Sequence, residues 1–245
     1  YFHKIVHQST HELSKGAIIS WPEKQMKGGI RGDALFADQA IVDPELTLTL
    51  PIEQLRLTGF DIFTHAVETY ISRQAKPLTA IYSREAIKAV THYLPLALQN
   101  QQNMEARTQL SFHSMLMGYN LANSSTCLPH RLQYPLGAMT HTAHALGLAA
   151  LYPAWILTTF NASREKFNDV SGWIMDGLSL DNISSDIFTN LSKFMEKIHL
   201  SPTLQELGCD NEVCRELASQ VSGNMANDPW WYDGADILQI YNKSL

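Results

Sequence analysis

Apolar side chains recur at helical spacing along most of this chain, from about residue 51 onward. The segments with this spacing are separated by helix-ending residues such as Pro77, Pro129 and Pro202. The pattern predicts helices over residues 52–73, 78–100, 104–122, 130–141, 144–160, 164–174, 183–197, 211–225 and 234–243. No repeat of fixed period is present, so we expect a mainly α fold, with one all-helical domain over residues 51–245.

The first fifty residues have a different character. GAIIS (16–20) and QAIVD (39–43) are typical of short strands. Glycines in KGGIRGD (27–33) predict a turn, and Pro44 predicts a stop. We therefore expect residues 1–50 to be a short α/β segment.

Charge and cysteine content exclude some classes of function. The 245 residues carry 18 Lys and Arg against 24 Asp and Glu, a net charge of −6, and no basic block. Nucleic acid is therefore not an expected partner. Cys127, Cys209 and Cys214 form neither a disulfide framework nor a CxxC metal motif, and no signal peptide pattern opens the chain. We expect a cytoplasmic protein with free thiols.

One apolar stretch, at residues 143–163, is long enough to span a membrane. It lacks Asp, Glu, Lys and Arg, but it carries His144, Pro153 and Asn161. These polar and helix-bending residues favour a buried core helix, so we expect no membrane association.

The stretch GFDIFTHAVETYIS (59–72) places Asp61 and His65 four residues apart in a predicted helix. Residues at this spacing share one helix face, so they can offer an oxygen and a nitrogen to one metal ion. Such a pair also occurs in ordinary helices, as an acid of the first turn and a core histidine. A second group of ligands is therefore needed to decide.

The second group lies in CLPHRLQYPLGAMTHTAHALGLAALYP (127–153). His130, His141 and His144 cluster there among apolar residues, and Pro129 is typical of a helix start. Burying several imidazoles among so few charges is costly unless they have partners. The two groups together predict a metal site.

Both motifs, at their spacing, resemble the iron-containing (group III) alcohol dehydrogenase family. The family pattern has Asp-x3-His on one helix, a His before Pro-Leu-Gly-Ala, and a further His 14 residues after that one. Matched residue by residue, the resemblance implies metal ligands at Asp61, His65, His130 and His144. Residues 35–51 and 223–229 also resemble family segments, so the implied fold is of the dehydroquinate synthase-like, iron alcohol dehydrogenase type.

The chain departs from the family at a position next to the implied metal. Members carry a second histidine four residues after the third ligand, where this chain has Tyr134. In the family that histidine helps to carry the alcohol proton away. A phenol is a poorer shuttle at neutral pH, although it can donate a hydrogen bond to a substrate oxygen. The catalytic candidates are therefore Tyr134 and His141, which could substitute as a shuttle.

A second departure concerns the nucleotide cofactor. Family members begin with a nucleotide-binding domain that has a glycine-rich phosphate loop, whereas no GxGxxG pattern occurs here. The resemblance implies that residues 1–50 are a remnant of that domain and that 51–245 is the catalytic metal-binding domain. Residues 6–19 correspond to a Thr/Gly-rich cofactor loop, in which Ser9, Thr10 and Glu12 are the candidate NAD(P) contacts.

The amino terminus offers an alternative metal site. His3, His7 and His11 recur every four residues, as they would along one helix face. Only Glu12 supplies an acid nearby, and a terminus tends to fray. The helical site remains the leading interpretation.

The resemblance implies a metal-dependent, NAD(P)-linked oxidoreductase acting on a small alcohol or aldehyde. Three imidazoles and one carboxylate suit Fe(II) or Zn(II). Candidate wall residues are Phe63, Met139, Tyr134 and Trp155, although aromatic and Met residues at helical spacing are more often plain core. Trp230 and Trp231 could cap the cleft or pack against the last helix.

Three interpretations stay open. The first is the catalytic part of an alcohol dehydrogenase whose nucleotide domain is supplied elsewhere. The second is a non-enzymatic, stand-alone metal-binding domain, which Tyr134 and the altered loop favour. The third is a related metal-dependent lyase or polyol dehydrogenase, against which the complete set of four ligands argues. A flank left exposed by an absent domain would favour a homodimer.

Overall fold

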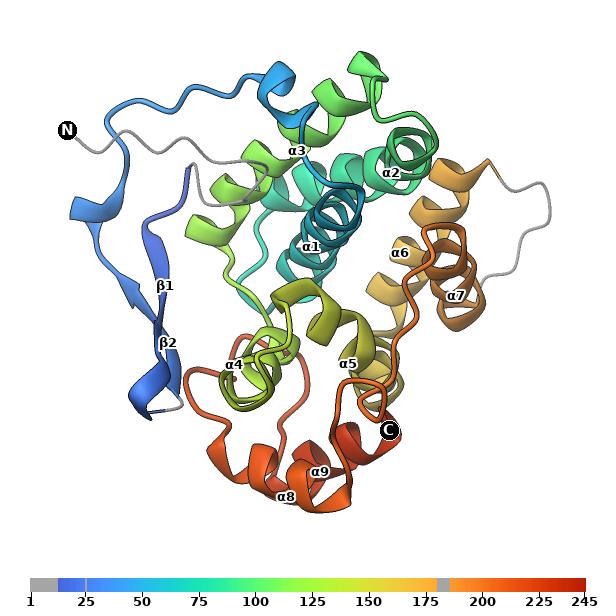
Figure 1. Ribbon diagram of the computed structural model, residues 1–245. Helices are drawn as coiled ribbons and strands as arrows, with labels where there is room; N and C mark the ends of the chain where they lie inside the picture. Colours follow the sequence, from blue (N-terminus) through green and yellow to red (C-terminus); the bar gives the residue numbers. More distant parts are fainter. Residues whose placement is uncertain (1–12, 25, 180–185) are drawn as a thin grey trace.

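The computed structural model describes residues 13–24, 26–179 and 186–245, in which one hairpin precedes a set of packed helices (Figure 1). The hairpin consists of β1 (Gly16–Trp21) and β2 (Met26–Arg31). In the described residues the helices are α1 (Ile52–Ile71), α2 (Pro77–Gln99), α3 (Met104–Asn123), α4 (Leu128–Thr140), α5 (His144–Thr159), α6 (Arg164–Leu178), α7 (Ile187–Lys197), α8 (Asn211–Gln220) and α9 (Gly234–Lys243). The prediction of a mainly α fold is confirmed.

The structure confirms one of the two predicted strands, and it corrects the predicted turn and the other predicted strand. β1 contains the predicted strand at 16–20. The turn predicted over residues 27–33 is wrong, because Gly28 and Gly29 lie within β2 and pair with Ile19 and Ile18. Small residues suit this pairing, since a Cβ on Gly29 would lie 3.3 Å from Ile18 Cδ1. The strand predicted at 39–43 does not form, because it has no neighbouring strand among the described residues.

Polar caps explain where several helices begin. Asn103 accepts a hydrogen bond from the backbone N–H of Ala106 at the start of α3, and Asp210 accepts from two N–H groups at the start of α8. Asp186 caps α7 in the same way, and the residues predicted as helical before it lie outside the described residues. Predicted and observed ends agree closely except that α6 runs on to Leu178 and α8 ends at Gln220.

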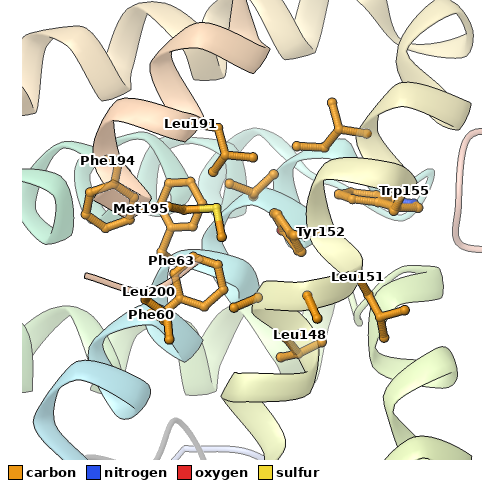
Figure 2. Packing of buried hydrophobic residues seen from close by; sticks show 14 of the residues in the cluster. Phe60, Phe63, Leu148, Leu151, Tyr152, Trp155, Leu191, Phe194, Met195 and Leu200 are labelled. Atoms are coloured by element: carbon orange, nitrogen blue, oxygen red, sulfur yellow. The ribbon is translucent and has the colours of Figure 1, made fainter. Parts of the chain in front are cut away.

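Helix α1 is the centre of the packing, since α2, α3, α5 and α6 all lie against it (Figure 1). An aromatic cluster fills the core beside it (Figure 2). Phe63 lies 5.0 Å from Phe194 between ring centroids, and Phe60 lies 6.0 Å from Tyr152. These rings bury large apolar areas, which holds α1, α5 and α7 together.

The apolar helix expected in the core is found there. The segment His144–Ala162 is long and apolar enough to cross a membrane by length and composition, yet 61% of its apolar window is buried inside the protein. Tyr152 and Trp155 project from it into the core (Figure 2). Its hydrophobicity is therefore used in packing against α1.

We predict that Gly177→Ala destabilises the fold, because Gly177 sets the contact between α6 and α2. A Cβ there would lie 1.9 Å from Thr91 Oγ1 and 2.5 Å from the Lys88 carbonyl oxygen. Relieving this overlap requires the helices to separate, so urea unfolding should show a loss of about 1–3 kcal/mol.

Gly172→Ala is the matched control on the same helix. Gly172 is exposed and a Cβ there meets no atom within 4 Å, so the substitution should stabilise α6 by up to about 1 kcal/mol. Equal effects at the two glycines would contradict the proposed close contact.

Candidate metal centre

Helix α1 presents Asp61 and His65 on one face. Asp61 lies in the middle of the helix, so it is not an acid of the first turn. One turn later, His65 is buried, and its Nδ1 lies 3.5 Å from Asp61 Oδ2. The Asp61 and His65 side chains, four residues apart in the sequence, are therefore neighbours that can act as metal ligands together.

Helices α4 and α5 bring two further imidazoles to this pair. His130 lies in the first turn of α4, and its Nε2 is 3.0 Å from His65 Nε2 and 3.9 Å from Asp61 Oδ1. His144 is the first residue of α5, and its Nε2 is 3.5 Å from the same Oδ1. The structure thus brings together all four side chains that the family resemblance implied.

The spacing of these atoms fits a bound divalent ion. Metal–ligand bonds of about 2.0–2.1 Å at tetrahedral angles place ligand atoms roughly 3.3 Å apart. Taking one ligand atom from each residue, Asp61, His65 and His130 lie within 4.8 Å of one another, and His144 Nε2 lies 3.5 Å from Asp61 Oδ1. Asp61 Oδ1 is also buried without a hydrogen-bond donor from the described residues. A cation would satisfy that oxygen, and the nitrogen-rich set suits Fe(II) or Zn(II).

Two supporting side chains orient the imidazoles. Glu68 Oε1 lies 2.8 Å from His130 Nδ1, and Gln133 Oε1 lies 2.5 Å from His144 Nδ1. When these oxygens accept a proton from Nδ1, the Nε2 lone pair of each ring faces Asp61. Partners of this kind fix the ring and raise the basicity of a metal ligand.

Sequence reasoning missed Glu68 and Gln133. The signal was present, because each lies one helical turn beyond a candidate ligand, at i+3 from His65 and from His130. The sequence does not show that Glu68, on α1, contacts His130, on α4. Its second oxygen accepts the Cys127 N–H at 2.8 Å.

Burial keeps the imidazole of His144 neutral. Burial lowers the pKa of His144 to about 3, and the carboxylate of Asp61 opposes this shift while His130 and Lys27 add to it. Burial also raises the pKa of Glu68 well above its usual range, against the effect of the Cys127 N–H and the Arg131 charge. A neutral imidazole is the form that binds metal.

Asp228 joins the loop before α9 to the helices of the site. Its Oδ2 accepts hydrogen bonds from Leu128 N at 3.1 Å and from Trp155 Nε1 at 2.9 Å, and its Oδ1 accepts from Tyr232 at 2.8 Å. Burial raises the pKa of Asp228 to about 6, although these donors lower it. Because Leu128 begins α4, Asp228 sets the position from which His130 projects.

A cavity of about 880 Å³ lies against the cluster. His65, His130 and His144 line it on one side, and the β1–β2 hairpin lines it on the other. Tyr134 also lines it, and its hydroxyl accepts a hydrogen bond from Arg131 Nη1 at 3.1 Å. The volume is typical of a small-molecule site.

The remaining candidates lie elsewhere. His141 ends α4 in the left-handed conformation, at φ 57°, and is exposed, so the structure does not bring it to the cluster. Ser9, Thr10 and Glu12 lie outside the described residues. The alternative site of His3, His7 and His11 does so too.

The candidate wall residues divide between core and cavity. Phe63 and Trp155 are fully buried in the apolar core, and Met139 packs against that core. None of the three lines the cavity, whereas Tyr134 does. Trp231 is 69% exposed and stacks under the Arg73 guanidinium, and Trp230 is also exposed.

We predict that the chain binds one divalent ion and that His130→Ala abolishes binding. Metal content after anaerobic loading with Fe(II) or Zn(II) measures this. Glu68→Ala should weaken metal affinity by about 10–100-fold, because it removes the partner of His130 Nδ1.

His141→Asn is the control for the metal measurement. Asparagine tolerates the left-handed conformation that His141 adopts, and His141 lies outside the cluster, so metal content should be unchanged. Loss of the ion in His141→Asn but not in His130→Ala would place the site elsewhere.

Comparison with known proteins identifies relatives of the chain. It is 27% identical over 248 residues to the long-chain primary alcohol dehydrogenase AdhA of Thermoanaerobacter ethanolicus, over 98% of this chain and 62% of that protein. It is 32% identical over 226 residues to long-chain-alcohol dehydrogenase 1 of Geobacillus thermodenitrificans, over 89% of this chain and 57% of that protein. The chain therefore spans about three-fifths of the length of these relatives.

Solved structures agree with the sequence comparison. The iron-containing alcohol dehydrogenase from Thermotoga maritima superposes with a TM-score of 0.82 at 26% identity, over 97% of this chain and 61% of that chain. The sequence model of the Fe-containing alcohol dehydrogenase family, C-terminal part, matches residues 56–245. That match includes all four side chains of the cluster, and the chain belongs to the Fe-containing alcohol dehydrogenase family.

Proposed function

We propose that this chain is the metal-binding, catalytic part of a metal-dependent, NAD(P)-linked alcohol dehydrogenase or aldehyde reductase that acts on a small alcohol or aldehyde. The observation that carries the proposal is the convergence of three imidazoles and one carboxylate at the wall of a cavity of about 880 Å³. Family membership supports oxidoreductase chemistry.

The ligands we propose are Asp61, His65, His130 and His144. A divalent ion held by these residues would supply a Lewis acid for an alcohol or carbonyl oxygen, and a bound nicotinamide would supply the hydride chemistry. The protein's own contribution is to orient the rings. Glu68 and Gln133 hold two of the three imidazoles by hydrogen bonds to Nδ1.

Tyr134 is the group we propose for positioning the substrate oxygen. Its hydroxyl lines the cavity and accepts from Arg131, which leaves the phenol proton for a bond to substrate. His141 stays our candidate for moving the proton to solvent. It is exposed at the end of α4, so this role requires a water chain between it and the cavity.

The cofactor contacts that we propose are Ser9, Thr10 and Glu12, together with the portion of sequence that the longer relatives have in addition. The three cysteines are free and buried, in keeping with the cytoplasmic location we propose. NAD or NADP is the cofactor class.

One observation favours a second candidate, a metal-binding domain without dehydrogenase activity. Tyr134 stands where the family resemblance implies a proton-carrying histidine, and the nearest alternative, His141, is not brought to the cluster. Such a domain would keep its ion and would not bind a dinucleotide.

We predict that the metal-loaded protein oxidises NADH or NADPH in the presence of butanal. The assay is run on the chain alone and with the nucleotide-binding part of the Thermoanaerobacter relative added. Tyr134→Phe should lower kcat by about tenfold through loss of one hydrogen bond to the substrate oxygen, and His144→Ala should remove both turnover and the ion.

Dinucleotide binding, measured separately by calorimetry, distinguishes the two candidates. A dissociation constant of millimolar or below, with turnover, supports the dehydrogenase. One bound ion per chain without dinucleotide binding in either format would establish the non-enzymatic domain.

We further propose that the protein is a homodimer that covers its exposed apolar hairpin and the segment after it. Trp21, Met26, Ile30, Phe36 and Ile41 are all exposed there, which is unusual for so many large apolar side chains in one stretch. Light scattering should report twice the mass of one chain. A monomer at high concentration would refute this.

A further inference from the structure

The cavity beside the histidine cluster is lined by positive charge. Lys15, Lys27, Arg31 and Arg131 face it, and no Asp or Glu is among the described residues that line it. The whole chain carries a net charge of −6. A concentration of cations in one hollow of an acidic protein focuses a positive potential there.

Arg31 lies at the hairpin wall of the cavity, at the end of β2. Both Nη atoms donate to the Ser125 hydroxyl at 3.3 Å, and no carboxylate of the described residues forms an ion pair with it. Arg31 is exposed, and partial burial and then the charge of Arg131 lower its pKa.

Arg131 lies on the helix wall, directly after His130 in α4. It is only 8% exposed, and its hydrogen bonds go to neutral groups, the Tyr134 hydroxyl at 3.1 Å and the Asn224 carbonyl at 3.5 Å. Arg131 also interacts electrostatically with Glu68, but both oxygens of Glu68 already bond to His130 and Cys127. A buried guanidinium is costly when none of the described carboxylates forms an ion pair with it, and an anionic ligand would offset that cost.

The two arginines are placed to act together. Strand β2 packs against α4, and Arg31 on β2 and Arg131 on α4 both line the same cavity. The planar fork of each guanidinium matches the two oxygens of a carboxylate or phosphate. The histidine cluster occupies another part of the same wall.

We propose that Arg31 and Arg131 form an oxyanion clamp, which holds a carboxylate or phosphate at the far end of a substrate whose hydroxyl or carbonyl carbon lies at the histidine cluster. The substrate class is thus acidic alcohols and aldehydes. The identity of the ligand as a substrate rests on the dehydrogenase function proposed above. Lys27 also lines the cavity and adds positive charge, and Lys15 contributes less because it is paired with Asp33.

Matched aldehydes test the clamp by binding alone. The metal-loaded chain is titrated by calorimetry with 4-oxobutanoate and 6-oxohexanoate, and with butanal and hexanal, which carry a methyl in place of the carboxylate. We expect the acid of at least one pair to bind about 10–100-fold more tightly, as charge-assisted hydrogen bonds require. Equal affinity within both pairs would overturn the proposal.

Substitutions test whether the two arginines cause the preference for acidic aldehydes. Arg31→Met should bring the ratio of affinities close to one, and Arg131→Met should do the same. Arg131 also bonds to Asn224, so circular dichroism is recorded for that variant, and Arg31→Met carries the conclusion if it unfolds. Arg84→Met removes an exposed arginine paired with Glu85 on α2 and should leave the ratio unchanged. An unchanged ratio in Arg31→Met would overturn the clamp.

A final pair of measurements distinguishes an anionic group of the substrate from a phosphate of the cofactor. If Arg31→Met weakens NADH or NADPH binding tenfold and leaves the aldehyde ratio intact, the anion is a cofactor phosphate and the proposal is wrong. An acid preference in a protein that never turns over would retain the clamp and refute the dehydrogenase function. Turnover with equal affinities for acidic and neutral aldehydes would refute the clamp and retain the dehydrogenase function.

Discussion

The rest of the structure depends on a single constraint, that α1 must carry a polar cluster and the centre of the apolar core at once. Asp61, His65 and Glu68 lie one turn apart on one face, while Phe60 and Phe63 lie in the aromatic core. A buried carboxylate and buried imidazoles are costly unless each has a partner. Helices α4 and α5 supply such partners from their first turns, through His130 and His144.

The partners come from segments far apart in the chain. His130 and its neighbour Cys127 hold both oxygens of Glu68, and His144 is held by Gln133. Asp228 then fixes the start of α4 from a loop about 100 residues later. Because each bond needs the others to be in place, the cluster is preorganised by the fold and needs little rearrangement to take an ion.

The cavity lies next to this cluster and adds a cationic surface to the site. Its floor is the histidine cluster, and its opposite wall is the hairpin that brings Arg31 and Lys27 toward α4. A site with a metal-binding end and a cationic end would orient an extended, acidic substrate in one direction only. The family relatives supply the chemistry of the first end, whereas the second end follows from this chain's own arginines.

The sequence by itself determined the helical domain and most of the helix ends, because helical period, proline and capping residues are local signals. The four candidate ligands came from the resemblance of two sequence motifs to a known family. It misjudged the 27–33 segment, where cross-strand pairing outweighs the turn preference of glycine. Only the tertiary structure decided that Glu68 contacts His130, that His141 is exposed and does not line the cavity, and that Arg31 lines the same cavity as Arg131. These relations join residues up to about 100 positions apart, and a contact at that separation is set by packing, which no local pattern records.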